Sequence, residues 1–87
     1  MSLTSNEMFA ELLDQGFGFD FAYNIVSKVC PAIDLKDARY IHALHVDIVN
    51  TKAKIQITTG DDDYLCESLV DLQSEYAEMR TLGVKVA

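Results

Sequence analysis

The chain has 87 residues, which is enough for one small domain, and we expect residues 1–87 to form a single unit. Hydrophobic residues make up 49% and charged residues 24%, proportions that exclude an intrinsically disordered chain. Fourteen acidic against seven basic residues give a formal charge of −7, which disfavours direct binding to nucleic-acid phosphates or to an anionic membrane and favours a basic protein as partner.

The first predicted elements are two helices that form a helical hairpin. Thr4 followed by Glu7 has the spacing of a capping box, so we expect a helix to begin there and to end near Gly16. We expect Asp20 to cap a second helix, which Pro31 closes. The turn between the helices carries three phenylalanines, Phe17, Phe19 and Phe21. We expect them to turn inward and lock the helices together; the alternative is an exposed aromatic contact for a partner.

The middle of the chain alternates in the manner of β-strands. Apolar residues occupy every second position from Leu44 to Ile48 and again from Ala53 to Ile57. We expect an antiparallel β-hairpin with its turn at Asn50 and Thr51, because a slip of one residue would destroy the agreement of the apolar faces. A brief helical turn capped by Asp34 would precede this hairpin.

Residues 61–82 are predicted to form a long helix. Its apolar residues recur at spacings of four and three, which places them on one helical stripe: Leu65, Leu69, Leu72, Tyr76 and Met79. Gly83 is suited to end the helix, and residues 84–86 are candidates for a third short strand parallel to the second. The predicted fold class is α+β, with an N-terminal helical hairpin and an antiparallel β-hairpin covered by the long C-terminal acidic helix.

The same helix carries a second column, made of acidic residues. This acidic column consists of Asp63, Glu67, Asp71, Glu75 and Glu78. Carboxylates at this spacing are neighbours on a helix and repel one another by about 0.2–0.5 kcal/mol per pair. Because nothing between Asp61 and Met79 is basic, the column is either a solvated face or a docking surface, with Val70 as an apolar contact beside it.

The sequence contains no recognisable catalytic or cofactor motif. His42 and His45 have a spacing found in zinc sites, but on a strand they would point to opposite faces. Cys30 and Cys66 are isolated, and we expect both to be buried as small apolar residues. The acidic run 61–63 lacks the glycine and glutamate positions of a calcium loop, and helix capping explains it. We therefore expect no enzyme, no metal and no cofactor.

These patterns predict a non-enzymatic interaction module, a small adaptor or inhibitor, that presents the acidic column to a basic protein, including one that itself binds nucleic acid. Two alternatives remain: a ligand-binding or regulatory domain with an apolar pocket near Tyr40, His42 and Tyr76, and a structural subunit that uses the phenylalanine-rich turn. A homodimer is a further prospect, because a small sheet leaves open edges. Few cysteines and no apolar stretch of membrane length favour the cytoplasm.

Overall fold

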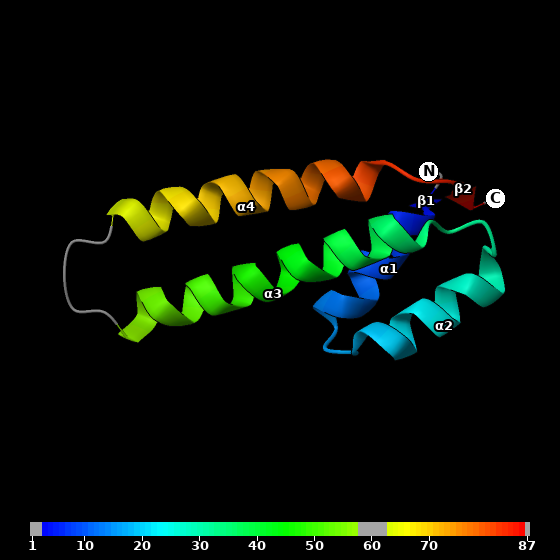
Figure 1. Cartoon of the computed structure of the whole chain (residues 1–87), viewed down its shortest axis with the longest axis horizontal. Helices are drawn as coiled ribbons and strands as arrows, with labels where there is room; N and C mark the ends of the chain where they lie inside the picture. The colour runs from blue at the N-terminus through cyan, green and yellow to red at the C-terminus, as the bar shows by residue number, and fades with distance from the viewer. Residues whose placement is uncertain (1–2, 58–62, 87) are drawn as a thin grey trace.

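The computed structural model describes residues 3–57 and 63–86 and shows a mainly helical fold (Figure 1). Within these residues the elements are, in order, β1 (Leu3–Thr4), α1 (Ser5–Asp14), α2 (Phe19–Val29), α3 (Leu35–Ile57), α4 (Asp63–Thr81) and β2 (Lys85–Val86). The two short strands pair antiparallel, Leu3 with Val86 and Thr4 with Lys85. The predicted α+β class is therefore wrong, and so is the predicted parallel pairing of the last strand.

The segment predicted as a β-hairpin belongs to α3, a continuous helix of 23 residues. Its buried residues are Ala38, Ile41, Leu44 and Ile48, whose spacings of three, three and four are those of a helical stripe. Leu44 and Ile48 fit both periods, since positions four apart share a face on a strand and on a helix. Val46, which the strand would have buried with them, is exposed. The supposed turn at Asn50 and Thr51 lies within the helix.

The start of α3 explains the prediction of a brief helical turn. The Asp34 carboxylate accepts a hydrogen bond from the backbone nitrogen of Lys36 at 2.8 Å, so Asp34 does stabilise a helix start. That helix continues from Leu35 to Ile57 instead of ending after one turn.

Helix α4 confirms the long C-terminal helix. Gly83 lies at φ 100° just after it, in the left-handed region that favours glycine. Tyr76 of the predicted stripe is buried and the other four stripe residues are half-buried. The stripe packs against α3 and α1 rather than against a sheet.

The caps of the first two helices agree with the prediction only in part. The Thr4 hydroxyl accepts a hydrogen bond from the backbone nitrogen of Glu7 at 3.0 Å, and Gly16 lies at φ 100° after α1. Helix α2 instead begins after Gly18, with no side-chain cap, and Asp20 lies in its first turn. The predicted cap by Asp20 is wrong.

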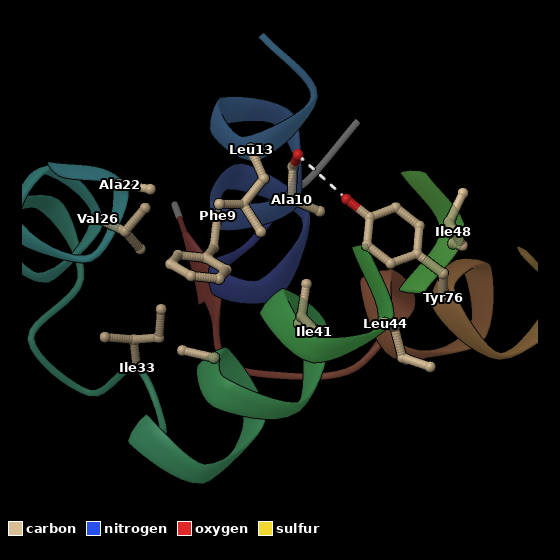
Figure 2. Packing of buried hydrophobic residues seen from close by; sticks show 11 residues of the cluster. Phe9, Ala10, Leu13, Ala22, Val26, Ile33, Ile41, Leu44, Ile48 and Tyr76 are labelled. Carbon is tan, nitrogen blue, oxygen red and sulfur yellow. Dashed lines mark hydrogen bonds between the residues drawn. The ribbon is translucent and has the colours of Figure 1, made fainter. Parts of the chain in front are cut away.

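The core lies where α1 meets α2, α3 and the C-terminal half of α4 (Figure 2). Phe9 and Leu13 of α1 are at its centre, and the Phe9 ring meets the edge of Phe19 at 5.5 Å between ring centroids. Burial of side chains of this size stabilises a fold by about 1.5–3 kcal/mol each. Helix α1 therefore contacts all three other helices from the centre of the core.

The molecule is elongated, with extents of 46 × 22 × 21 Å. Helices α3 and α4 lie side by side as a long hairpin, and α1 and α2 lie beside only one half of it (Figure 1). At about 1.5 Å per residue, α3 is roughly 34 Å long and α1 only about 15 Å. We call the part of the hairpin beyond α1, residues 49–57 and 63–72, the two-helix arm.

Candidate functional site

The acidic column forms an exposed stripe along the whole of α4. All five of its residues are exposed, whereas the apolar stripe on the opposite side of the helix is buried or half-buried. Fifteen residues separate Asp63 from Glu78, so the column spans roughly 22 Å at helical rise. The predicted geometry of this face is thus present, although α3 and α1 replace the expected sheet beneath it.

The middle of the column adjoins the predicted apolar contact. Val70 is 63% exposed, and it lines a shallow, open depression with Glu67, Asp71 and Cys66. The structure therefore brings three of the predicted partner-binding residues together. Cys66 is exposed, so the prediction that both cysteines are buried holds only for Cys30.

Glu75 marks the edge of the column that is nearest to α3. Its carboxylate accepts a hydrogen bond from the Tyr40 hydroxyl, and this bond raises the pKa of the Tyr40 phenol. Glu75 is therefore less available to a partner than Glu67 or Asp71.

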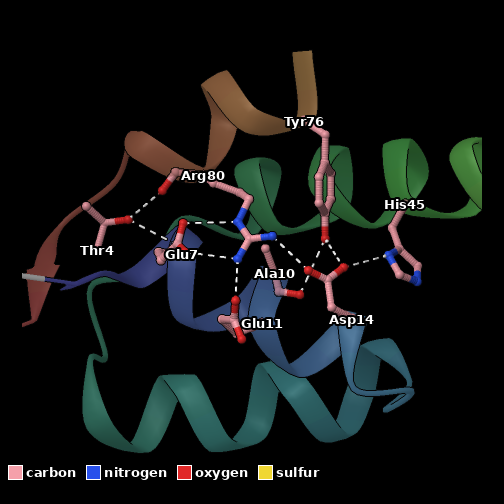
Figure 3. Close-up of polar contacts among 8 residues, drawn as sticks. All are labelled: Thr4, Glu7, Ala10, Glu11, Asp14, His45, Tyr76 and Arg80. Atoms are coloured by element: carbon pink, nitrogen blue, oxygen red, sulfur yellow. Dashed lines mark hydrogen bonds and ion pairs between the residues drawn. The ribbon is translucent and has the colours of Figure 1, made fainter. Parts of the chain in front are cut away.

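The one basic residue of α4 binds α1 and not the column (Figure 3). Arg80 Nε and Nη2 donate to the two Glu7 carboxylate oxygens at 3.0 and 2.9 Å. Nη2 also donates to Glu11 at 2.6 Å, and Nη1 donates to Asp14 at 2.7 Å. We call these four residues the Arg80 cluster. The hydrogen bonds to Glu7, followed by those to Glu11 and Asp14, raise the pKa of Arg80 further above its already high ordinary value.

Sequence reasoning missed the Arg80 cluster. In a capping box the Glu7 side chain would bind the backbone at the start of its own helix. In the structure the Glu7 carboxylate binds Arg80 instead. Glu7, Glu11 and Asp14 are spaced four and three apart, the same pattern that drew attention to α4. That spacing was the available signal for an acidic face on α1. The cation that binds this face, Arg80, is 66 or more positions away in the sequence, so the sequence alone did not reveal it.

Asp14 connects the Arg80 cluster to the centre of the hairpin. Its Oδ1 accepts a hydrogen bond from the Tyr76 hydroxyl at 3.0 Å and lies 3.5 Å from His45 Nδ1 (Figure 3). Burial, together with the negative charge of Asp14, raises the pKa of Tyr76. The Tyr76 phenol therefore stays protonated and serves as a hydrogen-bond donor at neutral pH.

A groove of about 440 Å³ opens between α3 and α4 where α1 ends. It is lined by Asp14, His45, Ile48, Val49, Lys52, Gln73 and Tyr76. Of the residues that were predicted to line an apolar ligand pocket, only Tyr76 is among them. Within the groove, the Asp14 carboxylate is already hydrogen-bonded to Arg80 and to the Tyr76 hydroxyl.

The two histidines are on one helix, so the argument that a strand would separate them is wrong. His42 meets the edge of the Phe19 ring at 5.5 Å, and His45 lies beside Asp14. Among residues 3–57 and 63–86, no three His, Cys, Asp or Glu side chains are placed to hold a metal ion. Asp61 and Asp62 of the acidic run lie outside the described residues.

The phenylalanine-rich turn divides its side chains between core and surface. Phe19 is half-buried and stacks on Tyr23, as the inward prediction requires. Phe17 and Phe21 are 40% and 50% exposed and stack on each other at 4.6 Å. The inward prediction is therefore wrong for these two residues, which form a small exposed aromatic pair.

The fold and the site together define a small helical domain with an exposed acidic column on α4. Comparison of the chain with known protein families, with curated proteins and with solved structures finds no match. None of the helices in the described part of the chain combines the length and the hydropathy needed to cross a membrane.

Proposed function

We propose that this protein is a non-enzymatic interaction module that docks a basic partner protein on the acidic column of α4 and on Val70. The observation that carries the proposal is the orientation of Arg80. Its guanidinium is held by three carboxylates of α1, so the positive charge of α4 is directed away from the column.

Electrostatic repulsion within the column favours such a partner. Its five carboxylates form four neighbouring pairs along the helix, which together destabilise α4 by about 1–2 kcal/mol. A basic surface would relieve this repulsion on binding and would also accelerate association through long-range attraction. Val70 lies beside Glu67 and Asp71 and supplies the apolar contact that charge alone does not provide.

The spacing of the charges suits a protein better than a role as a strict nucleic-acid mimic. Neighbouring carboxylates four residues apart are separated by about 6 Å along the helix axis. Phosphates of one duplex strand advance only about 3.4 Å each along the axis. A groove lined by lysine and arginine side chains can adjust to the wider spacing, and such a groove also occurs on proteins that bind nucleic acid.

The test is an affinity capture with matched charge reversals. Wild-type protein, a Glu67→Lys/Asp71→Lys variant and a control Asp20→Lys/Asp47→Lys variant are immobilised and exposed to host lysate at low and high salt. Both variants change the net charge equally, and all four positions are exposed. We expect a basic protein to bind the wild type and the control, to be lost from the Glu67/Asp71 variant and to elute as salt rises.

Purified partner and each variant are then compared by calorimetry. An interaction that survives reversal of Glu67 and Asp71 as well as it survives the control reversal would rule out the column as the docking surface.

A further inference from the structure

The two-helix arm is the least buried part of the long hairpin formed by α3 and α4. None of its residues, 49–57 and 63–72, is buried, and its best-shielded apolar side chains are only half-buried: Ile55, Leu65, Leu69 and Leu72. The buried residues of the two helices all lie outside the arm: Ala38, Ile41, Leu44, Ile48 and Tyr76. Helical segments as short as those of the arm are marginal in water without packing, so a partly hydrated contact holds the arm closed.

The other end of α4 is attached to α1 by polar contacts as well as by burial. Asn6 Nδ2 donates a hydrogen bond to the backbone oxygen of Met79 at 3.1 Å, and the Tyr76 hydroxyl donates to Asp14 at 3.0 Å. The Arg80 cluster joins the same two helices. All of these contacts lie outside the arm, so the two segments of the arm can separate without breaking any of them.

Electrostatic repulsion is concentrated in the arm half of α4. Asp63 lies in the first turn of the helix, where the helix dipole favours an acid. Glu67 and Asp71 lie beyond that turn, and each is four residues from an acid on both sides. Three of the four like-charge pairs of the acidic column therefore involve Glu67 or Asp71. Because these carboxylates are held close together only while the segment is helical, their repulsion opposes the closed arm.

We propose that the two-helix arm is a conformational device that opens as one unit while the rest of the fold stays intact, and that the charge of the acidic column sets how often it opens. In the open state residues 49–57 and 63–72 lose their mutual contact and their helical structure. Cooperative opening of a weakly buried unit is a common way for a native protein to unfold in part. The boundary of the unit lies at Ile48, the last buried residue of α3 before the arm.

A basic partner that docks on Glu67 and Asp71 relieves their repulsion and stabilises the closed arm. These two carboxylates share a face only while this part of α4 is helical, so the partner binds the closed state better than the open one. Docking is thereby coupled to ordering of the arm, and part of the binding free energy is used to close it. This coupling rests on the proposed function, whereas the opening of the free arm does not.

The test is native-state hydrogen exchange of the full chain, followed by NMR at low urea concentrations. We expect the backbone amides of Ala53 and Leu69 in the arm to be protected at least about tenfold less than those of Leu44 and Tyr76. The two arm amides should also share one dependence on urea, although they belong to different helices, because a single opening exposes both. Protection that rises residue by residue from each helix end would show fraying and would overturn the opening as a unit.

Matched variants then test the role of charge. Glu67→Gln/Asp71→Asn removes three like-charge pairs and should slow exchange in the arm by about threefold to tenfold. Asp20→Asn/Asp47→Asn changes the net charge equally at exposed positions that have no acid three or four residues away, and it should leave exchange in the arm unchanged. Equal exchange of the arm in the two variants would overturn the control by charge.

A lysine hexapeptide added at constant ionic strength serves as the basic probe. It should slow exchange in the arm of the wild type and of the Asp20/Asp47 variant, and less in the Glu67/Asp71 variant. An arm that opens and responds to neutralisation but not to the peptide would overturn the coupling to docking and would leave the opening of the free arm in place. Loss of the partner in the capture experiment without any change in exchange would separate failure of the device from failure of the proposed function.

Discussion

Replacing Arg80 with methionine should test how the C-terminal helix is attached to the rest of the fold. Methionine keeps much of the apolar length of the side chain but removes all four hydrogen bonds to Glu7, Glu11 and Asp14. Hydrogen bonds to charged groups contribute about 1.5–3 kcal/mol each when shielded from water. The side chains of Glu7, Glu11 and Asp14 are 30%, 53% and 40% exposed. Water would therefore hydrate these carboxylates in the variant and offset much of the lost hydrogen-bond energy.

Arg80→Met should lower the free energy of unfolding by about 2–3 kcal/mol. Only the bidentate contact with Glu7 is well shielded from water, and without Arg80 the three acids of α1 would repel one another. For a domain of this size, 1 kcal/mol corresponds to about 4–8 °C in Tm, so Arg80→Met should lower Tm by roughly 10–20 °C. Thermal and urea unfolding followed by circular dichroism measure this change. Arg39→Met, on an exposed position of α3, is the control and should change Tm by less than about 3 °C.

A double-mutant cycle with Glu7→Gln separates the contact from general effects of the substitution. We expect a coupling free energy of about 1–2 kcal/mol between Glu7 and Arg80. Equal Tm values for Arg80→Met and Arg39→Met, or a coupling near zero, would show that the Arg80 cluster does not hold α4 to α1.

Two further predictions concern Gly83 and Tyr76. Both Gly83 and Gly16 lie at φ 100°, but a Cβ at Gly83 would come within 2.8 Å of Ser5 Oγ while one at Gly16 would meet nothing within 4 Å. Gly83→Ala should therefore destabilise the protein by about 2–4 kcal/mol and Gly16→Ala by only about 1–2 kcal/mol in urea unfolding; equal losses would contradict the close approach. Because burial and Asp14 raise the pKa of Tyr76 above its ordinary value of 10.0, the unfolded chain loses this proton first. The free energy of unfolding should then fall as pH rises above about 10, and it should fall less steeply with pH in Tyr76→Phe. The same dependence on pH in both proteins would refute the role of Tyr76.

The C-terminal helix was predictable because several local signals agree on it. Its apolar residues keep a helical period over four turns, and Gly83 follows with the conformational freedom that a helix end requires. The same holds for Thr4 and Gly16 at the two ends of α1. Where the periodicity and the caps indicate the same helix, tertiary packing keeps that helix.

The error in α3 arose because its second half satisfies two periods at once. Val46, Ile48 and Val49 are β-branched and favour a strand by propensity. The buried residue that decides the matter is Ile41, which precedes Leu44 by three positions and Ile48 by seven, so only helical spacing places it on their face. Packing against α4 then overrides the local preference of this part of α3.

Contacts between distant parts of the chain could not be predicted in the same way. Arg80 and Glu7 are 73 positions apart, and the sequence does not show that α4 runs back along α1. The groove, the exposed aromatic pair and the pairing of β1 with β2 all follow from this arrangement. Local patterns determine which residues share a face, whereas the identity of the facing element depends on the whole fold.

Helices α1 and α4 each carry acidic residues at spacings of three and four, but the two acidic faces have different surroundings. Glu7, Glu11 and Asp14 of α1 are joined by a single guanidinium, while the column of α4 lies on an exposed surface. The cation that stabilises α1 comes from α4, so the contact that secures the fold also leaves the acidic column without a basic residue on its own helix. An acidic stripe in a sequence is therefore weak evidence for a partner by itself. A docking surface on α4 is favoured because Arg80 points toward α1 and away from the acidic column.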